Sequence, residues 1–344
     1  MSEWLVYRGN GEPAPGRIDL LPEPPDWRRF DGEPLDEYPV PDIDSASVRR
    51  LGKRPPLPVQ DARTIELINA ALYLRRPLLV TGEPGSGKST LAHALAHELA
   101  LGRVLHWPVV SRTELKSGLY AYDAIARLQD AQISRSGVSA EPGVDAGRQD
   151  VSLGRYIRLG PLGTALLPSK RPRVLLIDEL DKSDIDLPND LLNVMEEGEY
   201  AIPELERISD RPAQATVEVL TDDGLRAPVT AGRVRCCAFP IIVMTSNGER
   251  EFPAPLLRRC IQLHLDPPRG KRLAAMVQAH FGEGADRTNR DLVDLFSTDS
   301  AGVPRPADQL LNAIFLTHHV APPNSPQRTE LARMLMGSLD PGQG

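Results

Sequence analysis

Residues 82–89 read Gly-Glu-Pro-Gly-Ser-Gly-Lys-Ser, and this run constrains the fold of the chain more than any other segment. The apolar run 77–81 before it is typical of a buried strand, and leucines recur every fourth residue from Leu91 to Leu99 after it, as on one helix face. A strand, a glycine-rich loop and a helix in this order are the setting of a phosphate-binding loop. The glycines let several backbone N–H groups converge at the helix N-terminus, where they can hold a phosphate.

The side chains of the loop indicate how a nucleoside triphosphate and a metal ion would be held. Lys88 is expected to reach the β- and γ-phosphates, and the Ser89 hydroxyl to complete the shell of a Mg²⁺ ion. A loop without a ligand is the alternative, and the Lys-Ser pair and both flanks argue against it. The predicted nucleotide-binding residues are Gly82, Glu83, Pro84, Gly85, Ser86, Gly87, Lys88, Ser89 and Thr90.

A second apolar run, at 174–177, ends in the carboxylates Asp178 and Glu179. Open α/β sheets bind their ligands at the carboxyl ends of the strands, so both carboxylates are expected to face the loop. Asp178 is positioned to hold the metal ion through water, and Glu179 to orient or deprotonate the water that attacks the γ-phosphate. A strand that ends in Asp-Glu is common; the loop upstream is what makes this pair a strong indication of hydrolysis.

Three further segments complete an ordered series. A third apolar run ends at Asn247, whose amide can hold a water against a phosphate. Arg258 and Arg259 follow it, and Arg305 stands in the later run Gly-Val-Pro-Arg-Pro. Taken in order, the five segments resemble the Walker A, Walker B, sensor 1, arginine finger and sensor 2 motifs of the AAA+ ATPases, over roughly residues 59–320.

The details look most like the MoxR branch, whose members carry Gly-Glu-Pro-Gly-x-Gly-Lys, a long segment before Walker B and Glu-Glu-Gly-Glu after it, here at 196–199. The resemblance implies that Asn247 is sensor 1 and Arg305 is sensor 2. It also implies that Arg259 is the arginine finger that reaches a neighbouring subunit, with Arg258 as the second candidate. Cys260 stands where the family has an aromatic residue. ATP and Mg²⁺ as cofactors and a ring, expected to be a hexamer, come from the same resemblance.

The remaining pattern predicts the α/β class: an AAA+ parallel sheet flanked by helices, followed by a small all-helical lid. We expect a proline-rich acidic N-terminal extension at 1–58, the α/β nucleotide-binding domain at 59–266 and the helical lid at 267–344. Strands are expected at 77–81 and 104–109 and a helix at 61–75. Helices in the lid are expected at 270–281, 307–319 and from 326 to about 338.

Two inserts are expected within the α/β domain, at 111–172 and 204–238. The first contains a predicted helix over 121–134, and in MoxR-like proteins an insertion in the second helix lies here and faces the central pore. In the second, alternation over 216–221, an Asp-Asp-Gly turn and a return at 226–230 predict a hairpin. It resembles the pre-sensor hairpin of the same clade, and a plain surface hairpin is the alternative.

The N-terminal extension is unusual in composition. It carries eleven of the 33 prolines, and residues 1–44 hold eleven Asp and Glu against four Lys and Arg, which equals the whole formal charge of −7. Regular structure is not expected at this proline density. A disordered acidic tail and an extended arm remain open, the arm docking its aromatic residues on the ATPase body, a neighbour or a partner. Partner recognition is expected in this arm and in the two inserts.

Composition and spacing limit the other possibilities. Three cysteines without a disulfide framework indicate a reducing compartment, and no apolar run is long enough to cross a membrane, so a cytoplasmic location is expected and a membrane partner is not. The balanced charge of residues 45–344 does not indicate a nucleic-acid partner. His93 and His97 have a spacing that zinc sites use, but the helix that carries them is already explained by the phosphate-binding loop.

Three function classes stay open. The first is a MoxR-like ATPase ring that remodels a protein partner, for which a protein with a von Willebrand factor A domain is the first candidate. The second is a McrB-like NTPase motor of a nucleic-acid-processing complex, which 247–250 and 257–259 resemble, although the Thr-Ala-Asp-Arg-Ser motif and a DNA-reading domain are missing. The third is a slow nucleotide-gated switch or scaffold. The residues alone do not separate ATP from GTP.

Overall fold

The computed structural model describes residues 4–35, 41, 42, 44–52, 61–135, 153–210, 215–299, 306–321 and 325–336. Its centre is a five-stranded sheet in which all strands run parallel, in the order β11-β1-β10-β5-β2. The strands are β1 (Leu78–Thr81), β2 (Leu105–Pro108), β5 (Val174–Asp178), β10 (Ile241–Ser246) and β11 (Ile261–His264). The predicted α/β class with a parallel sheet is confirmed.

Both faces of this sheet are buried, which explains why its strands read as continuous apolar runs. Leu78 and Val80 point to one core, together with residues of α2 (Ala62–Leu74) and α3 (Lys88–Glu98). Leu79 points to the opposite core, which α8 (Asp186–Glu197) and α10 (Ala254–Arg259) help to cover. The helix predicted at 61–75 is α2, with Asp61 as its N-cap and Arg75 as its C-cap.

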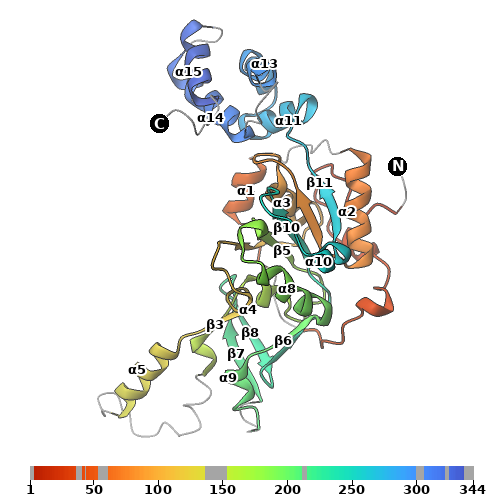
Figure 1. Cartoon of the computed structure of the whole chain (residues 1–344), viewed down its shortest axis with the longest axis vertical. Helices are drawn as coiled ribbons and strands as arrows, with labels where there is room; N and C mark the ends of the chain where they lie inside the picture. Colours follow the sequence, from red (N-terminus) through yellow and green to blue (C-terminus); the bar gives the residue numbers. More distant parts are fainter. Residues whose placement is uncertain are drawn as a thin grey trace.

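A second, six-stranded sheet lies on the side of the molecule away from the lid (Figure 1). Its order is β3-β4-β7-β8-β9-β6, and it is built from the two predicted inserts and the short strand β6 between them in the chain. The strands are β3 (Tyr120–Tyr122), β4 (Ile157–Leu159), β6 (Glu199–Ala201), β7 (Thr216–Leu220), β8 (Arg226–Thr230) and β9 (Arg233–Arg235). The predicted hairpin is present as the antiparallel pair β7 and β8.

The first insert interrupts a helix. Two short helices, α4 (Leu115–Leu119) and α7 (Pro161–Ala165), pack together, and β3, α5 (Ala124–Arg135) and β4 lie between them in the chain. The helix predicted over 121–134 begins too early, because Tyr120–Tyr122 pairs antiparallel with β4 instead. The remaining short elements of this region are the 3-10 helices Leu153–Tyr156 and Leu180–Lys182 and the helix α9 (Pro203–Glu206).

The N-terminal extension packs on the body of its own chain. Val6, Tyr7 and Ile18 belong to the core that α2 and α3 cover, and Phe30 stacks on Phe239 with ring centroids 5.2 Å apart. The expectation of no regular structure is wrong for part of it, which forms two 3-10 helices (Arg17–Leu20 and Asp26–Arg28) and α1 (Ser45–Leu51). The aromatic residue Tyr38 lies outside the described residues.

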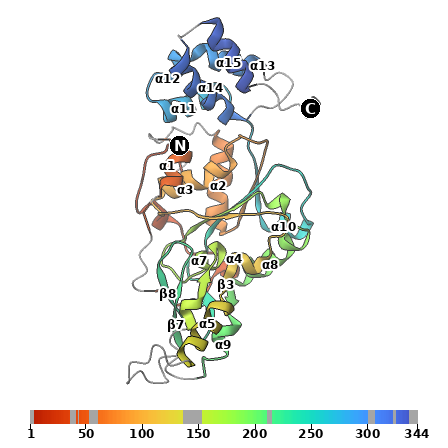
Figure 2. The same cartoon turned by 90° about the vertical axis from the view of Figure 1, so that its left-hand side faces the viewer.

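The C-terminal region is helical (Figure 2), and its buried side chains form a hydrophobic core of their own. The helices predicted at 270–281, 307–319 and from 326 are present, and two short helices at 285–299 were not predicted. This region, called the lid below, consists of α11 (Gly270–Phe281), α12 (Ala285–Thr288), α13 (Arg290–Asp299), α14 (Ala307–Val320) and α15 (Pro326–Met336). Among the described residues, no helix is long and apolar enough to span a membrane.

Candidate nucleotide site

The glycine-rich loop joins the buried strand β1 to α3, as the sequence pattern requires. Gly82, Gly85 and Gly87 have positive φ angles of 150°, 78° and 91°, which residues other than glycine rarely adopt. Gly85 also has no room for a side chain, because an added Cβ would lie 2.6 Å from the backbone nitrogen of Ala307 in the lid. The loop conformation therefore depends on its glycines and places the loop against the lid.

Lys88 is the first residue of α3 and its ammonium group lies within the loop. It donates to the carbonyl oxygens of Gly82 at 2.7 Å and Glu83 at 2.8 Å. Burial lowers the pKa of Lys88, and the nearby carboxylates of Asp181, Asp178 and Glu179 partly oppose that effect. A cation is thus held at the point where the loop would receive phosphate oxygens.

Asp178, at the end of β5, is the centre of a hydrogen-bond network. Its Oδ1 accepts from Ser89 Oγ and Thr245 Oγ1, both at 2.7 Å, and its Oδ2 lies 3.2 Å from His106 Nε2. Burial alone would raise the pKa of Asp178, but the hydrogen bonds from His106, Ser89 and Thr245 outweigh it and hold the pKa below its usual range. The carboxylate is therefore ionised at neutral pH.

Glu179 follows at the turn after β5 and has a left-handed backbone with φ 61°, uncommon for a residue other than glycine. Its backbone N–H donates to Thr245 Oγ1 at 2.8 Å, which fixes the turn against β10. Its carboxylate pairs with Lys182 Nζ at 2.8 Å. The Glu179 carboxylate therefore lies next to Asp178 at the carboxyl end of β5, beside the glycine-rich loop.

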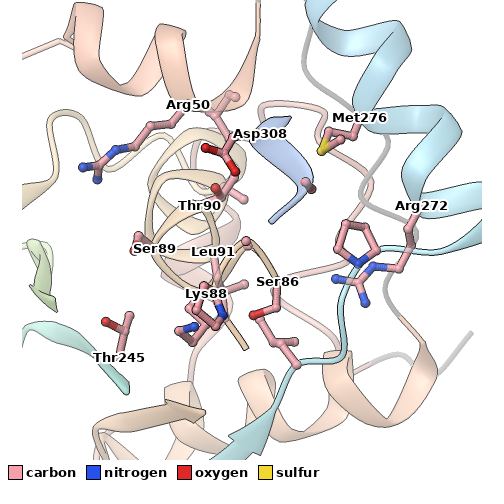
Figure 3. A pocket seen from close by; sticks show the side chains of 18 of the residues that line it. Arg50, Ser86, Lys88, Ser89, Thr90, Leu91, Thr245, Arg272, Met276 and Asp308 are labelled. Carbon is pink, nitrogen blue, oxygen red and sulfur yellow. The ribbon is translucent and has the colours of Figure 1, made fainter. Parts of the chain in front are cut away.

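These groups border a cavity of about 740 Å³, a volume in the range of small-ligand sites (Figure 3). The loop and the end of β5 contribute polar side chains to the lining, and the lid and the N-terminal extension contribute both apolar and charged ones. The lining consists of the loop and first turn of α3 (84–91), Ala94, His97, Asp178, Glu179, Lys182, Thr245, Asn247, Gly11, Arg49, Arg50, Leu51, Leu265 and the lid residues Pro268, Arg272, Ala275, Met276, Ala279, His280, Ala307, Asp308 and Leu311.

The donors at the loop and at the end of β5 suit a small hard cation. The Ser89 hydroxyl and the Asp178 carboxylate supply oxygen ligands 2.7 Å apart, and Mg²⁺ takes a few protein oxygens together with phosphate and water. Among the described residues, no three His, Cys, Asp or Glu side chains gather as a separate metal site. The residues present therefore fit Mg²⁺ bound together with a nucleotide.

Residues 77–260 match the protein family described as AAA domain (dynein-related subfamily). The chain belongs to this AAA family. Comparison with curated proteins gave no match.

Two solved AAA+ structures resemble this AAA chain. One is a single-substitution variant of RuvB from Thermotoga maritima, with 15% sequence identity, a TM-score of 0.38, and coverage of 79% of this chain and 67% of that chain. The other is NtrX of Brucella abortus in complex with ATP, with 12% identity, a TM-score of 0.37, and coverage of 76% of this chain and 52% of that chain. This chain thus spans about half the length of NtrX.

The residues predicted as Walker A, Walker B and sensor 1 of the AAA domain come together at one cavity. Seven of the nine predicted loop residues, 84–90, line the cavity, while Gly82 and Glu83 contribute the carbonyls that hold Lys88. Asn247 lies directly after β10 and lines the same cavity. Its backbone N–H donates to Asp181 Oδ2 at 2.9 Å, which joins the sensor segment to the Walker B turn.

The two candidate finger arginines lie elsewhere. Arg258 and Arg259 end α10 and are absent from the cavity lining. Arg259 Nε pairs with Glu196 Oε1 at 2.9 Å, and both side chains are partly exposed. Arg305, the candidate sensor 2, lies outside the described residues, although Ala307, two residues later, lines the cavity.

Several site residues were missed by the sequence analysis. His106 and Thr245 reach Asp178 only because β2 and β10 flank β5, an order the sequence does not state. Asp181 is 3% exposed and accepts backbone N–H groups from Asn247 and Glu249, a role that a single acidic residue in sequence does not reveal. A polar residue inside an apolar strand, such as His106, is the one signal that could have been followed.

Proposed function

We propose that this chain is a MoxR-like AAA+ ATPase, which hydrolyses ATP with Mg²⁺ and uses the energy to remodel a protein client. The observation that carries hydrolysis is the convergence of Lys88, Ser89, Asp178 and Glu179 on one cavity. Lys88 would neutralise phosphate charge, and Ser89 and Asp178 would hold Mg²⁺, which supplies further charge neutralisation. Glu179 would orient or deprotonate the attacking water once it leaves Lys182.

The MoxR assignment is supported by the two inserts. The β3-α5-β4 segment lies between the packed helices α4 and α7, as an insertion in the second helix would. The hairpin β7–β8 precedes β10, the strand that ends just before Asn247, and β7 pairs with β4 of the first insert. The two inserts therefore form one structural unit on the side of the α/β body away from the lid.

The position of Arg258 and Arg259 favours a ring. Both side chains lie outside their own cavity, so an arginine of this pair that stabilises a γ-phosphate would have to act on a neighbouring subunit. Such a finger is worth about 10³–10⁵ in rate in GTPases. We therefore propose a ring, a hexamer by resemblance, in which Arg259 completes the neighbour's site.

The client is proposed to be a protein, with a von Willebrand factor A-domain protein as the first candidate. The exposed helix α5 presents Ile125 and Leu128, which are 72% and 61% exposed, on the first insert. Apolar side chains of this kind favour contact with a protein surface over contact with a nucleic acid, which is bound mainly through basic residues.

Mixing two inactive variants tests the shared site. Glu179→Gln keeps its finger but lacks the water-activating carboxylate, and Arg259→Ala keeps its own site but lacks the finger. We expect each alone to hydrolyse ATP at least ~100-fold more slowly than the wild type, and their equimolar mixture to regain part of the activity. Wild-type activity per subunit should also rise with protein concentration.

The control is Arg258→Ala, which should retain most of the activity by itself. Its equimolar mixture with Glu179→Gln should show no more activity than the Arg258→Ala subunits contribute alone. Full activity of the wild type on dilution to monomers, established by sedimentation, would contradict the shared site. An inactive mixture in which both variants still assemble with each other would contradict the role of Arg259.

A further inference from the structure

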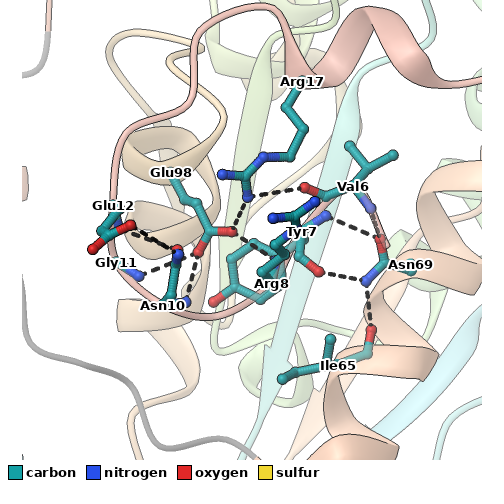
Figure 4. Close-up of polar contacts among 10 residues, drawn as sticks. All are labelled: Val6, Tyr7, Arg8, Asn10, Gly11, Glu12, Arg17, Ile65, Asn69 and Glu98. Atoms are coloured by element: carbon teal, nitrogen blue, oxygen red, sulfur yellow. Dashed lines mark hydrogen bonds and ion pairs between the residues drawn. The ribbon is translucent and has the colours of Figure 1, made fainter. Parts of the chain in front are cut away.

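The N-terminal extension is fixed on the α/β body near its start by two buried polar side chains (Figure 4). Glu98 is 1% exposed, and its carboxylate accepts the backbone N–H groups of Arg8 at 2.6 Å and Asn10 at 3.1 Å. Asn69 of α2 accepts the backbone N–H of Val6 at 2.8 Å. The path of the extension is therefore set by buried polar groups before the chain reaches α8.

Arg28, further along the extension, binds the end of α8. Its Nη1 donates to the carbonyl oxygen of Met195 at 3.0 Å, in the last turn of that helix. Its Nε and Nη2 donate to the carbonyl oxygen of Arg75 at 3.2 Å and 3.0 Å. The guanidinium lies 4.3 Å from the centroid of the Phe239 ring. The last carbonyls of a helix lack partners within it and favour a cation, so Arg28 fixes this end of α8.

The residues that follow Arg28 hold the turn after α8. Gly198 has no room for a side chain, because an added Cβ would overlap the ring of Phe30. Asp31 lies 3.6 Å from Arg235, which itself pairs with Glu199 at 2.6 Å. This part of the extension thus contacts both the last turn of α8 and the turn that comes next.

Glu196 lies between these contacts and binds the candidate arginine finger. Its Oε1 is 2.9 Å from Arg259 Nε and 4.0 Å from Arg28 Nη1. Arg259 Nη1 also donates to the carbonyl oxygen of Pro255 at 3.3 Å. The side chains of Glu196 and Arg259 are 43% and 44% exposed, so their ion pair adds little to stability. It does fix the direction of a long side chain whose guanidinium keeps further N–H donors for a phosphate.

We propose that Glu196 positions Arg259 for the γ-phosphate in the neighbouring subunit, and that the N-terminal extension supports this position through Arg28. The inference rests on the finger role of Arg259 proposed above. A displacement of about 1 Å in a group that acts on the transition state can cost about 100-fold in rate. The extension therefore influences hydrolysis at a site in another subunit, although neither Arg28 nor Glu196 lines the cavity of its own chain.

Mixing variants tests whether Glu196 acts through the finger. Glu196→Ala should lower the kcat of ATP hydrolysis about tenfold in the assembled protein and leave nucleotide affinity unchanged, because its own site is intact. Its equimolar mixture with Glu179→Gln, whose finger is held normally, should gain activity several-fold per Glu196→Ala subunit. Its mixture with Arg259→Ala should gain none, because no subunit then presents a positioned finger.

Three further variants complete the comparison. Arg28→Gln should show the same pattern with a smaller loss of kcat, about threefold, because Glu196 remains. Glu196→Gln, whose amide oxygen can still accept from Arg259 Nε, should retain more activity than Glu196→Ala. The control is Glu197→Ala, which removes the exposed neighbouring carboxylate and should keep the wild-type kcat. ADP binding by calorimetry and sedimentation verify folding and assembly of each variant.

A wild-type kcat in Glu196→Ala, where Arg259→Ala is impaired, would overturn the inference. A Glu196→Ala chain that no longer assembles, or that assembles with Glu179→Gln without a gain, would also overturn it, because the defect would then lie in the fold or in its own site. A wild-type kcat or lost ADP binding in Arg28→Gln would overturn the role of the extension. Wild-type hydrolysis by Arg259→Ala would instead refute the proposed finger, a result distinct from all of these.

Discussion

Replacing His93 by glutamine should make the stability of the protein less sensitive to acid. His93 is 3% exposed on α3, where it joins α1 of the N-terminal extension to the nucleotide-binding helix. Its Nε2 faces Arg50, whose guanidinium can only donate, so this nitrogen must accept and the ring is neutral. Burial, and next the charge of Arg50, lower the pKa of His93 from 6.5 to about 4, against the opposing effect of Asp44.

The sign and size of the effect follow from this shift. Because the folded-state pKa lies below the unfolded value, the unfolded chain binds the proton first as the pH falls. The contribution of His93 to stability is complete above pH 6.5 and is lost as the pH falls from 6.5 towards 4. Between about pH 7.5 and about pH 5, this one group should lower the free energy of unfolding by about 2 kcal/mol.

Urea unfolding at both pH values measures this loss. It is followed by tryptophan fluorescence, to which Trp107, 4% exposed in β2, contributes a buried reporter. With an m-value of about 3 kcal/mol/M, the wild-type midpoint should fall by about 0.7 M more than that of His93→Gln. Glutamine offers an amide oxygen to Arg50 and does not titrate, so other acid-sensitive groups cancel in the comparison. Equal midpoint shifts in the two proteins would refute the buried neutral histidine.

Two further substitutions test the packing of the inserts. Asp223→Ala should cost about 3–5 kcal/mol in urea unfolding, because it leaves Arg173 buried without its carboxylate partner at 2.8 Å; a cost below about 1 kcal/mol would show that this ion pair does not anchor the hairpin. Gly163→Ala should lower the melting temperature clearly, because its Cβ would overlap the carbonyl oxygen of Leu119 in α4. The comparison is Gly224→Ala, which has open space around it and should cost only the strain of its positive φ, about 1–2 kcal/mol; equal effects would contradict the close packing of α4 and α7.

The nucleotide motifs could be predicted because each is local in sequence. The loop 82–89 specifies its own conformation through its glycines, and Asp178 and Asn247 stand at the ends of apolar runs that read as parallel strands. The hairpin β7–β8 was equally readable, since alternation and turn chemistry occur within one short stretch. In these segments the local pattern and the fold agree.

The contacts that the sequence did not reveal are those between distant segments. Glu98 binds the extension across 90 residues of chain, and Asn69 across 63. Proline content predicted no regular structure and left a disordered tail and a docked arm both open, because contacts at this separation do not show in the local pattern. The helix of the first insert begins late for a related reason, because Tyr120–Tyr122 finds a strand partner far along the chain. Deleting residues 1–44 would remove Val6, Tyr7 and Ile18 from the core. Partner binding by this extension therefore stays a prediction for its exposed residues only, such as Trp27.

Nucleotide binding and hydrolysis should be separable at two residues of one cavity. Phosphate release from Mg²⁺-ATP, measured beside nucleotide binding for the wild type, Lys88→Ala and Glu179→Gln, is the most direct test. The account predicts turnover by the wild type, loss of binding in Lys88→Ala, and in Glu179→Gln retained binding with turnover reduced at least ~100-fold. No turnover by the assembled wild type, or an equal loss of binding in both variants, would contradict it.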